Sequence, residues 1–336
     1  MMKHEMPMQF AHRLMLGCAT ILIALAHGQA GAAESSDSYP SRPVRAIVPF
    51  PAGSGGDAVM RPVAERLSEQ IGKPVIIENR PGAGTVIGMN LVAKAPPDGY
   101  TLLLATTSLV ITPGLMPNLP FDPVKDFTPL MLIGVTPLLL LADPKTNITN
   151  VRELLAAARA KPGQLNYSSS GSGGALHLGM ELLKSMTGIN IAHIPYKGSA
   201  EAMQSMIAGD VQTGLNTLEL PVMSQVTSGR LRALGITGRS RMETYPQIPT
   251  IAESGVPGFE VVSWHGVLAP ARMPAAIAER LESELGKALQ APKVRSILGA
   301  RGMQIEAAGS TAFAAFIGKE LEKWTPIVKA SGAKMD

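Results

Sequence analysis

Two turns rich in glycine and serine are the segments of this sequence whose residue types and spacing could bind a small molecule. The first covers residues 51–57 (PAGSGGD), and the second covers residues 168–174 (SSSGSGG). Each follows a strand-like run and precedes a helix-like run, and the N–H groups at the start of a helix are unpaired and carry a partial positive charge. Serine hydroxyls add donors that suit carboxylate oxygens. We therefore expect the two turns together to bind an anion.

Single side chains near the turns allow two interpretations each. Asp57 either caps the helix that follows the first turn or contacts the ligand, directly or through water. His177, in the first turn of the next helix, either donates to a carboxylate or is structural. His193 and His265 fall in strand-like runs, where we expect core groups with satisfied hydrogen bonds. These histidines have no metal-binding spacing, so we predict neither a metal nor a cofactor.

Three enzyme motifs compete with the binding interpretation. Gly53-x-Gly55-x-x-Ala58 after a strand, with Glu78 ending the next strand, imitates a dinucleotide-binding fingerprint. That motif leaves the second turn unexplained. The N-terminus, described below, also predicts export, and an exported chain meets little nicotinamide cofactor. The sequence has neither a G-x-S-x-G elbow nor the Gly-Lys-Ser/Thr of a P-loop. We predict no catalytic residue and no enzyme activity.

Alternating strand-like and helix-like runs predict an α/β fold around these turns. The first unit has strands over 44–50, 75–78 and 101–105, with helices over 57–71 and 85–94. The second unit follows the long apolar stretch 131–142. Its expected helices cover 151–160, 175–187 and 200–208, and its expected strands cover 165–168, 191–194 and 211–215.

The tail after residue 274 predicts three helices, over 275–289, 293–298 and 311–330, and these need a sheet to cover. The nearest uncovered sheet belongs to the first unit, so the chain must cross into the second unit near 138–141 and return near 261–268. We expect two doubly wound α/β lobes joined by a two-strand hinge, which implies a cleft that closes. Lobe 1 comprises residues 34–138 plus 262–336, and lobe 2 comprises residues 139–261.

The first 33 residues predict a secretory signal peptide. Lys3 and Arg13 precede an apolar run over 14–26, and small residues over 30–33 indicate cleavage near Ala32 or Ala33. The run is shorter than the roughly 20 residues that a spanning helix needs. Cys18 raises the alternative of a lipoprotein, but it lies inside the apolar run, whereas a lipidated cysteine follows it. We therefore expect release into the periplasm.

The composition of the chain limits which classes of function remain. Of the 336 residues 46% are hydrophobic and 17% are charged, which is enough to bury a core, and the formal net charge is only +4. Lysine and arginine are scattered without interleaved aromatics, so we expect no nucleic-acid partner. With the signal removed, the chain holds no cysteine and depends on its core for stability.

Taken in order along the chain, several segments resemble the tripartite tricarboxylate transporter receptors, also called Bug proteins. The matching segments are 49–53 (PFPAG) with Asp57, 78–84 (ENRPGAG), 97–102 (PDGYTL), 122–127 (DPVKDF), 165–167 (LNY), 177–178 (HL), 193–198 (HIPYKG) and 249–255 (PTIAESG). The resemblance implies a type II periplasmic-binding-protein fold. It also implies a receptor that captures a small carboxylate, a dicarboxylate or an aromatic carboxylate, for a tripartite tricarboxylate type transporter.

The resemblance also implies which residues bind the ligand. They are Ala52, Gly53, Ser54, Gly55, Gly56, Asp57, Thr107, Ser108, Ser168, Ser169, Ser170, Gly171, Ser172, Gly173, Gly174, His177 and Asn216. The sequence departs from the family at Thr85, where glycine is common, and at Asn216, where aspartate is common. The loss of a negative charge at Asn216 would favour a more anionic solute.

The expected partners are the small carboxylate and the membrane permease subunits, and we expect a monomer. The alternatives are a receptor that presents its ligand to a sensor kinase and a dinucleotide-binding enzyme.

Overall fold

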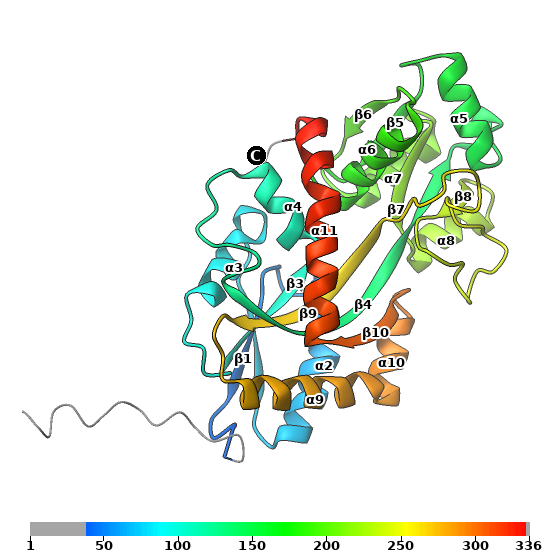
Figure 1. Cartoon of the computed structure of the whole chain (residues 1–336). Coiled ribbons are helices and arrows are strands. Elements are labelled where there is room, and N and C mark those ends of the chain that lie inside the picture. The colour runs from blue at the N-terminus through cyan, green and yellow to red at the C-terminus, as the bar shows by residue number, and fades with distance from the viewer. Residues whose placement is uncertain (1–37, 334–336) are drawn as a thin grey trace, which may run out of the picture. The chain divides into compact units, whose positions relative to one another are not determined.

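The computed structural model describes residues 38–333, in which strands and helices alternate along most of the chain (Figure 1). The signal peptide predicted for residues 1–33, and Cys18 within it, lie outside the described residues. In chain order the first series consists of β1 (Val44–Val48), α2 (Gly55–Ile71), β2 (Val75–Asn79), η1 (Ala83–Thr85), α3 (Val86–Ala93), β3 (Thr101–Thr106) and α4 (Ser108–Leu115). Strand β1 pairs in parallel with β2 on one side and β3 on the other, which confirms the predicted first α/β unit.

A second parallel group follows the long strand β4 (Phe127–Ala142). In chain order it consists of η2 (Pro144–Thr146), α5 (Val151–Ala160), β5 (Asn166–Ser169), α6 (Ala175–Thr187), β6 (Ala192–Pro195), α7 (Ser199–Ala208), β7 (Thr213–Thr217), α8 (Leu220–Thr227) and β8 (Arg232–Ile236). Strand β5 pairs in parallel with β6 and with β7. Strand β7 begins at Thr213, after the predicted start at Val211. The sequence analysis did not predict α8 and β8.

Two long antiparallel strands connect the groups. Strand β9 (Val262–Pro270) pairs with β3 and with residues 127–137 of β4, whereas residues 138–142 of β4 pair with β7 and β8. The strand order is β2-β1-β3-β9-β4-β7-β5-β6, with β8 and β10 also paired to β4. The crossings near 138–141 and 261–268 that the sequence predicted therefore belong to β4 and β9.

One buried threonine joins the two crossings. The N–H of Leu138 donates to Thr237 Oγ1 at 2.7 Å, and the Thr237 hydroxyl donates to the carbonyl of Val261 at 2.5 Å. Thr237 is fully buried. Since a buried hydroxyl requires partners, this residue ties the start of β9 to the point where β4 changes its pairing.

The tail consists of α9 (Ala275–Gln290), α10 (Pro292–Gly299), β10 (Gln304–Gly309) and α11 (Ser310–Ser331). Helices α9 and α10 pack against α2, and α11 packs along α4 and β4. The prediction that the tail returns to the first series is confirmed, and β10, which was not predicted, adds an antiparallel strand to β4.

The core along α11 includes a large buried aromatic cluster. Trp264 of β9 is fully buried and meets the rings of Phe313 and Phe316 edge to face, each at 5.7 Å between centroids. Its neighbours Ser263 and His265 alternate with it along the strand, so they face the opposite side of the sheet. Within residues 38–333, no helix is both long and apolar enough to cross a membrane.

Candidate functional site

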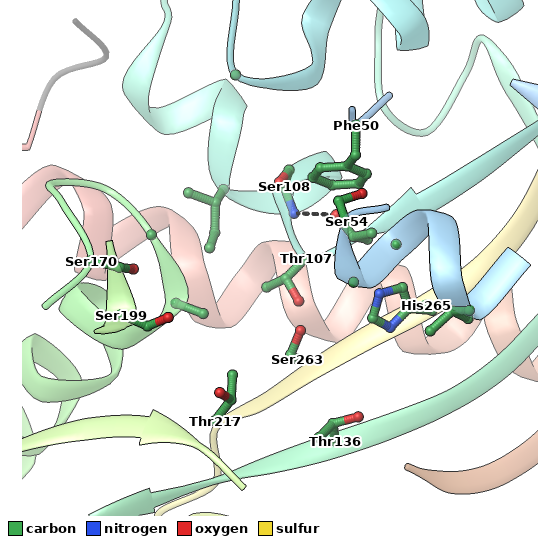
Figure 2. Close-up of a pocket in the computed structure, with 18 of the residues that line it drawn as sticks. Phe50, Ser54, Thr107, Ser108, Thr136, Ser170, Ser199, Thr217, Ser263 and His265 are labelled. Atoms are coloured by element: carbon green, nitrogen blue, oxygen red, sulfur yellow. Dashed lines mark hydrogen bonds between the residues drawn. The ribbon is translucent and has the colours of Figure 1, made fainter. Parts of the chain in front are cut away.

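A cavity of about 720 Å³ lies where the loops of both series meet β4 and β9. Figure 2 shows that hydroxyl groups dominate its labelled lining, with Ser54, Thr107 and Ser108 on one side and Ser170, Ser199 and Thr217 on the other. Thr136 and Ser263, from the two crossing strands, form its floor. Apolar contacts come from Phe50, Val59, Ile111, Leu115 and Met303. A volume of this size suits a small organic ligand.

Four helices begin at the wall of this cavity. The first residues of α2, α4, α6 and α7 are Gly55, Ser108, Ala175 and Ser199, and all four line it. Each helix start carries a partial positive charge, and its first N–H groups lack partners within the helix. Because the four ends surround one space, their fields add there, and the cavity favours an anion.

The first turn is stabilised by a buried carboxylate. Asp57 is 1% exposed, and its Oδ2 accepts hydrogen bonds from Gly53 N at 2.8 Å and Arg61 Nε at 2.7 Å. Its Oδ1 accepts from Arg61 Nη2 and Asn79 Nδ2, each at 2.9 Å. Burial by itself would raise the pKa of Asp57, but the hydrogen bonds from Arg61, Asn79 and Gly53 outweigh it and hold the pKa below its ordinary value.

Asp57 therefore braces the turn from behind. The helix begins at Gly55, so Ser54 is the N-cap, and its hydroxyl accepts from Asp57 N at 3.3 Å. The N-cap role expected for Asp57 is wrong, because the helix starts two residues earlier than the sequence predicted.

The second turn has a different support. Ser169 Oγ donates to the carbonyl of Gly171 at 2.8 Å, accepts from Gly171 N at 3.3 Å and lies 2.6 Å from His193 Nε2. Gly173 N donates to His177 Nδ1 at 3.0 Å. Ser170 and Ser172, between these braced positions, line the cavity together with Gly173 and Gly174.

Charge inside the cavity comes from two residues that the sequence analysis did not select. Arg301, in the turn after α10, is the one cationic side chain in the lining, and its guanidinium makes no ion pair within residues 38–333. Glu219, the exposed residue before α8, is the one carboxylate in that described lining. A guanidinium can hold a carboxylate by two parallel hydrogen bonds, so Arg301 supplies a full positive charge beside the helix ends.

His265 adds a polar group without a partner. Its Nδ1 is buried and has no hydrogen bond within the described residues. Burial, reinforced by the positive charge of Arg301, lowers the pKa of His265 to about 4, so the ring is neutral at neutral pH. The expectation that His265 is a satisfied core residue is wrong, because its ring lines the cavity and one nitrogen remains open.

The structure brings nine of the sequence-predicted site residues to the cavity wall. They are Ser54, Gly55, Gly56, Thr107, Ser108, Ser170, Ser172, Gly173 and Gly174. The other eight lie outside the lining: Ala52, Gly53, Asp57, Ser168, Ser169, Gly171, His177 and Asn216. Among these, Asn216 is buried, accepts from Thr217 N at 2.8 Å and donates to the carbonyl of Ser199, so it supports two lining residues.

Several lining residues escaped the sequence analysis for different reasons. Thr136, Ser263 and His265 lie on crossing strands that had been predicted, and the alternation along β9 could have indicated which side chains face the cleft. Arg301 follows a predicted helix in an ordinary turn, and no local pattern distinguishes it from other surface arginines. Ser199 opens α7 without a glycine-rich signature.

The fold and the cavity together define a class of protein: an α/β solute-binding protein with an anion-favouring site between two groups of parallel strands. Residues 59–333 match the family model described as the tripartite tricarboxylate transporter family receptor. The chain is 36% identical to protein BugT of Bordetella pertussis over 319 residues, which cover 94% of this chain and 98% of that protein.

Solved structures agree with this assignment. The chain is similar to R. palustris Rpa4515 with adipate, at 33% identity and a TM-score of 0.73, covering 88% of this chain and 99% of that one. It is also similar to MatC from Rhodopseudomonas palustris with bound malate, at 29% identity and a TM-score of 0.70, covering 86% of this chain and 100% of that one. This protein belongs to the tripartite tricarboxylate transporter receptor family, also called the Bug family.

Proposed function

We propose that this protein is a periplasmic receptor that captures a small carboxylate, a dicarboxylate or an aromatic carboxylate, and delivers it to the permease subunits of a tripartite tricarboxylate type transporter. One observation carries the proposal: four helix N-termini, a row of hydroxyls and the unpaired Arg301 surround one cavity. The relatives that bind adipate and malate support the ligand class. Reversible binding without chemistry fits a lining that pairs no nucleophile with a base among the described residues.

The ligand class is tested by thermal shift against a panel of carboxylates that includes adipate, malate and benzoate. A ligand present at about 100 times its dissociation constant adds about 2.7 kcal/mol to the free energy of unfolding. We expect one member of the panel to raise the melting temperature and to be recovered unchanged after long incubation. Steady turnover by the pure protein, abolished by substitutions in the two turns, would contradict a pure binding role.

Ser170 is the residue that we expect to contact a ligand carboxylate oxygen. It lines the cavity, and its hydroxyl can form a charge-assisted hydrogen bond. Ser170→Ala should weaken carboxylate affinity by roughly 10- to 100-fold and leave the unliganded melting temperature nearly unchanged. Calorimetric titration of the folded variant measures the affinity, and thermal unfolding without ligand measures the melting temperature. An unchanged affinity with a lower melting temperature would assign Ser170 a structural role.

We also propose that the protein closes on its ligand by rotation of lobe 1 (34–138 plus 262–336) against lobe 2 (139–261). The change in pairing of β4 after Pro137 and the start of β9 at Val262 support these boundaries. A ligand that bridges turns on both sides would stabilise the closed form. X-ray scattering should show a smaller radius of gyration with bound adipate, and identical profiles at saturation would refute closure.

Export to the periplasm and the downstream partner require separate tests. We expect cleavage of residues 1–33 during export, which mass spectrometry of the periplasmic protein would measure. Transport predicts that a deletion strain loses uptake of the bound carboxylate. Retained uptake with loss of a transcriptional response would favour presentation to a sensor kinase.

A further inference from the structure

We propose that His177 and His193 are positioning residues: they hold the turn 169–174 in its anion-binding conformation and do not themselves contact the ligand. This inference rests on the proposed carboxylate function. Neither histidine lines the cavity that Ser170 and Ser172 line. Both instead border a second hollow of about 500 Å³ beside Glu181, Lys184 and the end of α11, which Ser172 borders as well.

The two imidazoles belong to a stack of three rings under the turn. His177 of α6 lies 3.9 Å from His193 of β6, centroid to centroid, with 12° between the ring planes. Tyr167 of β5 lies beside both rings, 4.9 Å from His193 with 20° between the planes and 6.3 Å from His177 with 15°. Since the three residues come from β5, β6 and α6, the stack fixes the positions of the elements on both sides of the turn.

Hydrogen bonds connect this stack to alternate residues of the turn. His193 Nε2 bonds to Ser169 Oγ, and Ser169 Oγ bonds to both backbone groups of Gly171. His177 Nδ1 accepts the N–H of Gly173. The braced residues are 169, 171 and 173, and the cavity is lined by Ser170 and Ser172 between them together with Gly173 and Gly174.

The proton positions follow from the partners. The hydroxyl proton of Ser169 points to the carbonyl of Gly171, so His193 Nε2 must carry a proton and donate to Ser169 Oγ. His177 Nδ1 receives a donor, so it must be bare, and the proton of this neutral ring is on Nε2. Protonation of His177 would place an N–H against the N–H of Gly173.

The surroundings keep both rings neutral at neutral pH. Burial lowers the pKa of His177, with Glu181 opposing this and Lys184 adding to it. Burial also lowers the pKa of His193 to about 4, again with the charge of Glu181 opposing. Glu181 is engaged by Tyr167 Oη at 2.5 Å and Lys184 Nζ at 2.7 Å, and its Oε1 lies 4.0 Å from His177 Nε2. Residues 330–333, at and just after the end of α11, border the hollow and bring no titratable side chain.

The turn requires such support because of its composition. Gly171 and Gly173, on either side of Ser172, both have positive φ, at 119° and 80°, and glycine gives the backbone there many accessible conformations. Ordering this backbone only when the ligand binds would reduce affinity, and the ring stack orders it beforehand.

The test uses paired variants that remove or restore each hydrogen bond. Asparagine can place its Oδ1 near the position of His177 Nδ1, and glutamine can place its Nε2 near that of His193 Nε2. We expect His177→Leu and His193→Leu to weaken the affinity for the tightest binder among adipate, malate and benzoate by about tenfold. We expect His177→Asn and His193→Gln to stay within about threefold of the parent protein. Affinities that do not change in the leucine variants, or that fall equally in the restored variants, would overturn the inference.

A second measurement does not depend on the ligand. Amide hydrogen exchange of Gly171 and Gly173 in the unliganded protein should accelerate in the leucine variants and not in the restored ones. If the parent protein binds no member of the panel, the proposed function fails, and the exchange rates still decide the positioning role. Carboxylate affinity should also fall faster with acidification in the parent protein than in His177→Asn, because only the parent can protonate Nδ1; parallel profiles would contradict the assignment.

Discussion

The two glycine- and serine-rich turns at the cavity are alike in sequence and differ in what supports them. The turn before α2 is held by a buried carboxylate with an arginine, an amide side chain and a backbone N–H around it. The turn before α6 is held by a serine and two neutral imidazoles in a ring stack. The same local chemistry can therefore be positioned by charge on one side of a cavity and by ring packing on the other. The two supports should respond differently to mutation and to pH.

Loss of the charged support should have the largest effect. Asp57→Ala leaves Gly53, Arg61 and Asn79 without their shared acceptor, and we expect the free energy of unfolding to fall by about 2 to 3 kcal/mol. Asp57→Asn keeps one acceptor oxygen, so it should lower the free energy of unfolding less than Asp57→Ala does. Arg66→Gln, which breaks an exposed pair with Glu69 on the same helix, is the matched control and should be nearly neutral. Denaturant unfolding measures all three; an equal loss for Asp57→Ala and Arg66→Gln would refute the brace.

The two supports should fail in different pH ranges. An unfolded histidine has a pKa near 6.5, and the folded values for His193 and His265 are about 4, so only the unfolded chain takes up their protons between these values. Stability should therefore fall with acidification through this range, by at most about 1.4 kcal/mol per pH unit for each histidine. The pKa of Asp57 is depressed, so its contribution is lost only below the ordinary aspartate range.

Denaturant midpoints across this pH range measure the slope. His193→Gln removes one of the two titrating histidines, so it should reduce the slope of the free energy of unfolding between about pH 6.5 and 4. The loss of stability at lower pH, which belongs to Asp57, should not change. A slope that is identical in the variant would show that His193 titrates normally.

Arg301 contributes a full charge where both turns contribute partial charges. Arg301→Gln should weaken the affinity for adipate by roughly 10- to 100-fold if the guanidinium holds one of its two carboxylates. Hexanoate has a single carboxylate, which would bind at the turns, so the affinity for hexanoate should fall little. Calorimetric titration with both ligands distinguishes the roles, and equal losses for the two would mean that Arg301 acts on the site as a whole.

Substitution of the turn glycines should show the smallest difference between the two turns in the free energy of unfolding. Gly53 and Gly173 share a φ of 80°, so alanine at either position should cost about 1 to 2 kcal/mol of backbone strain. A Cβ at Gly53 meets open space, whereas one at Gly173 lies 2.8 Å from Leu115 Cδ1, so Gly173→Ala should cost slightly more and should also disturb the cavity. Gly174→Ala, with φ of −81° and open space, is the control. Thermal unfolding and adipate affinity measure the difference, and equal behaviour of all three would exclude a role for the turn geometry.

The sequence by itself determined the α/β alternation, both turns and the return of the tail to the first series. These features depend on local signals: hydrophobic periodicity defines strands and helices, and glycine with serine marks a strand-to-helix turn. The cavity position of Ser170 and Thr107 followed from the rule that strand ends and helix starts meet at one edge of a sheet.

Only the tertiary structure decided which polar groups face the cavity and which support the turns. Arg301, Ser199 and Thr136 come together from segments far apart in the chain, and nothing local marks them. The sequence placed Asp57, Ser169 and His177 among the expected ligand contacts, and that assignment stays a prediction while the structure shows them bracing the turns from behind. A turn presents alternate residues to opposite sides, and its orientation depends on partners such as Asn79 and His193, whose positions are set by strand pairing and long-range packing.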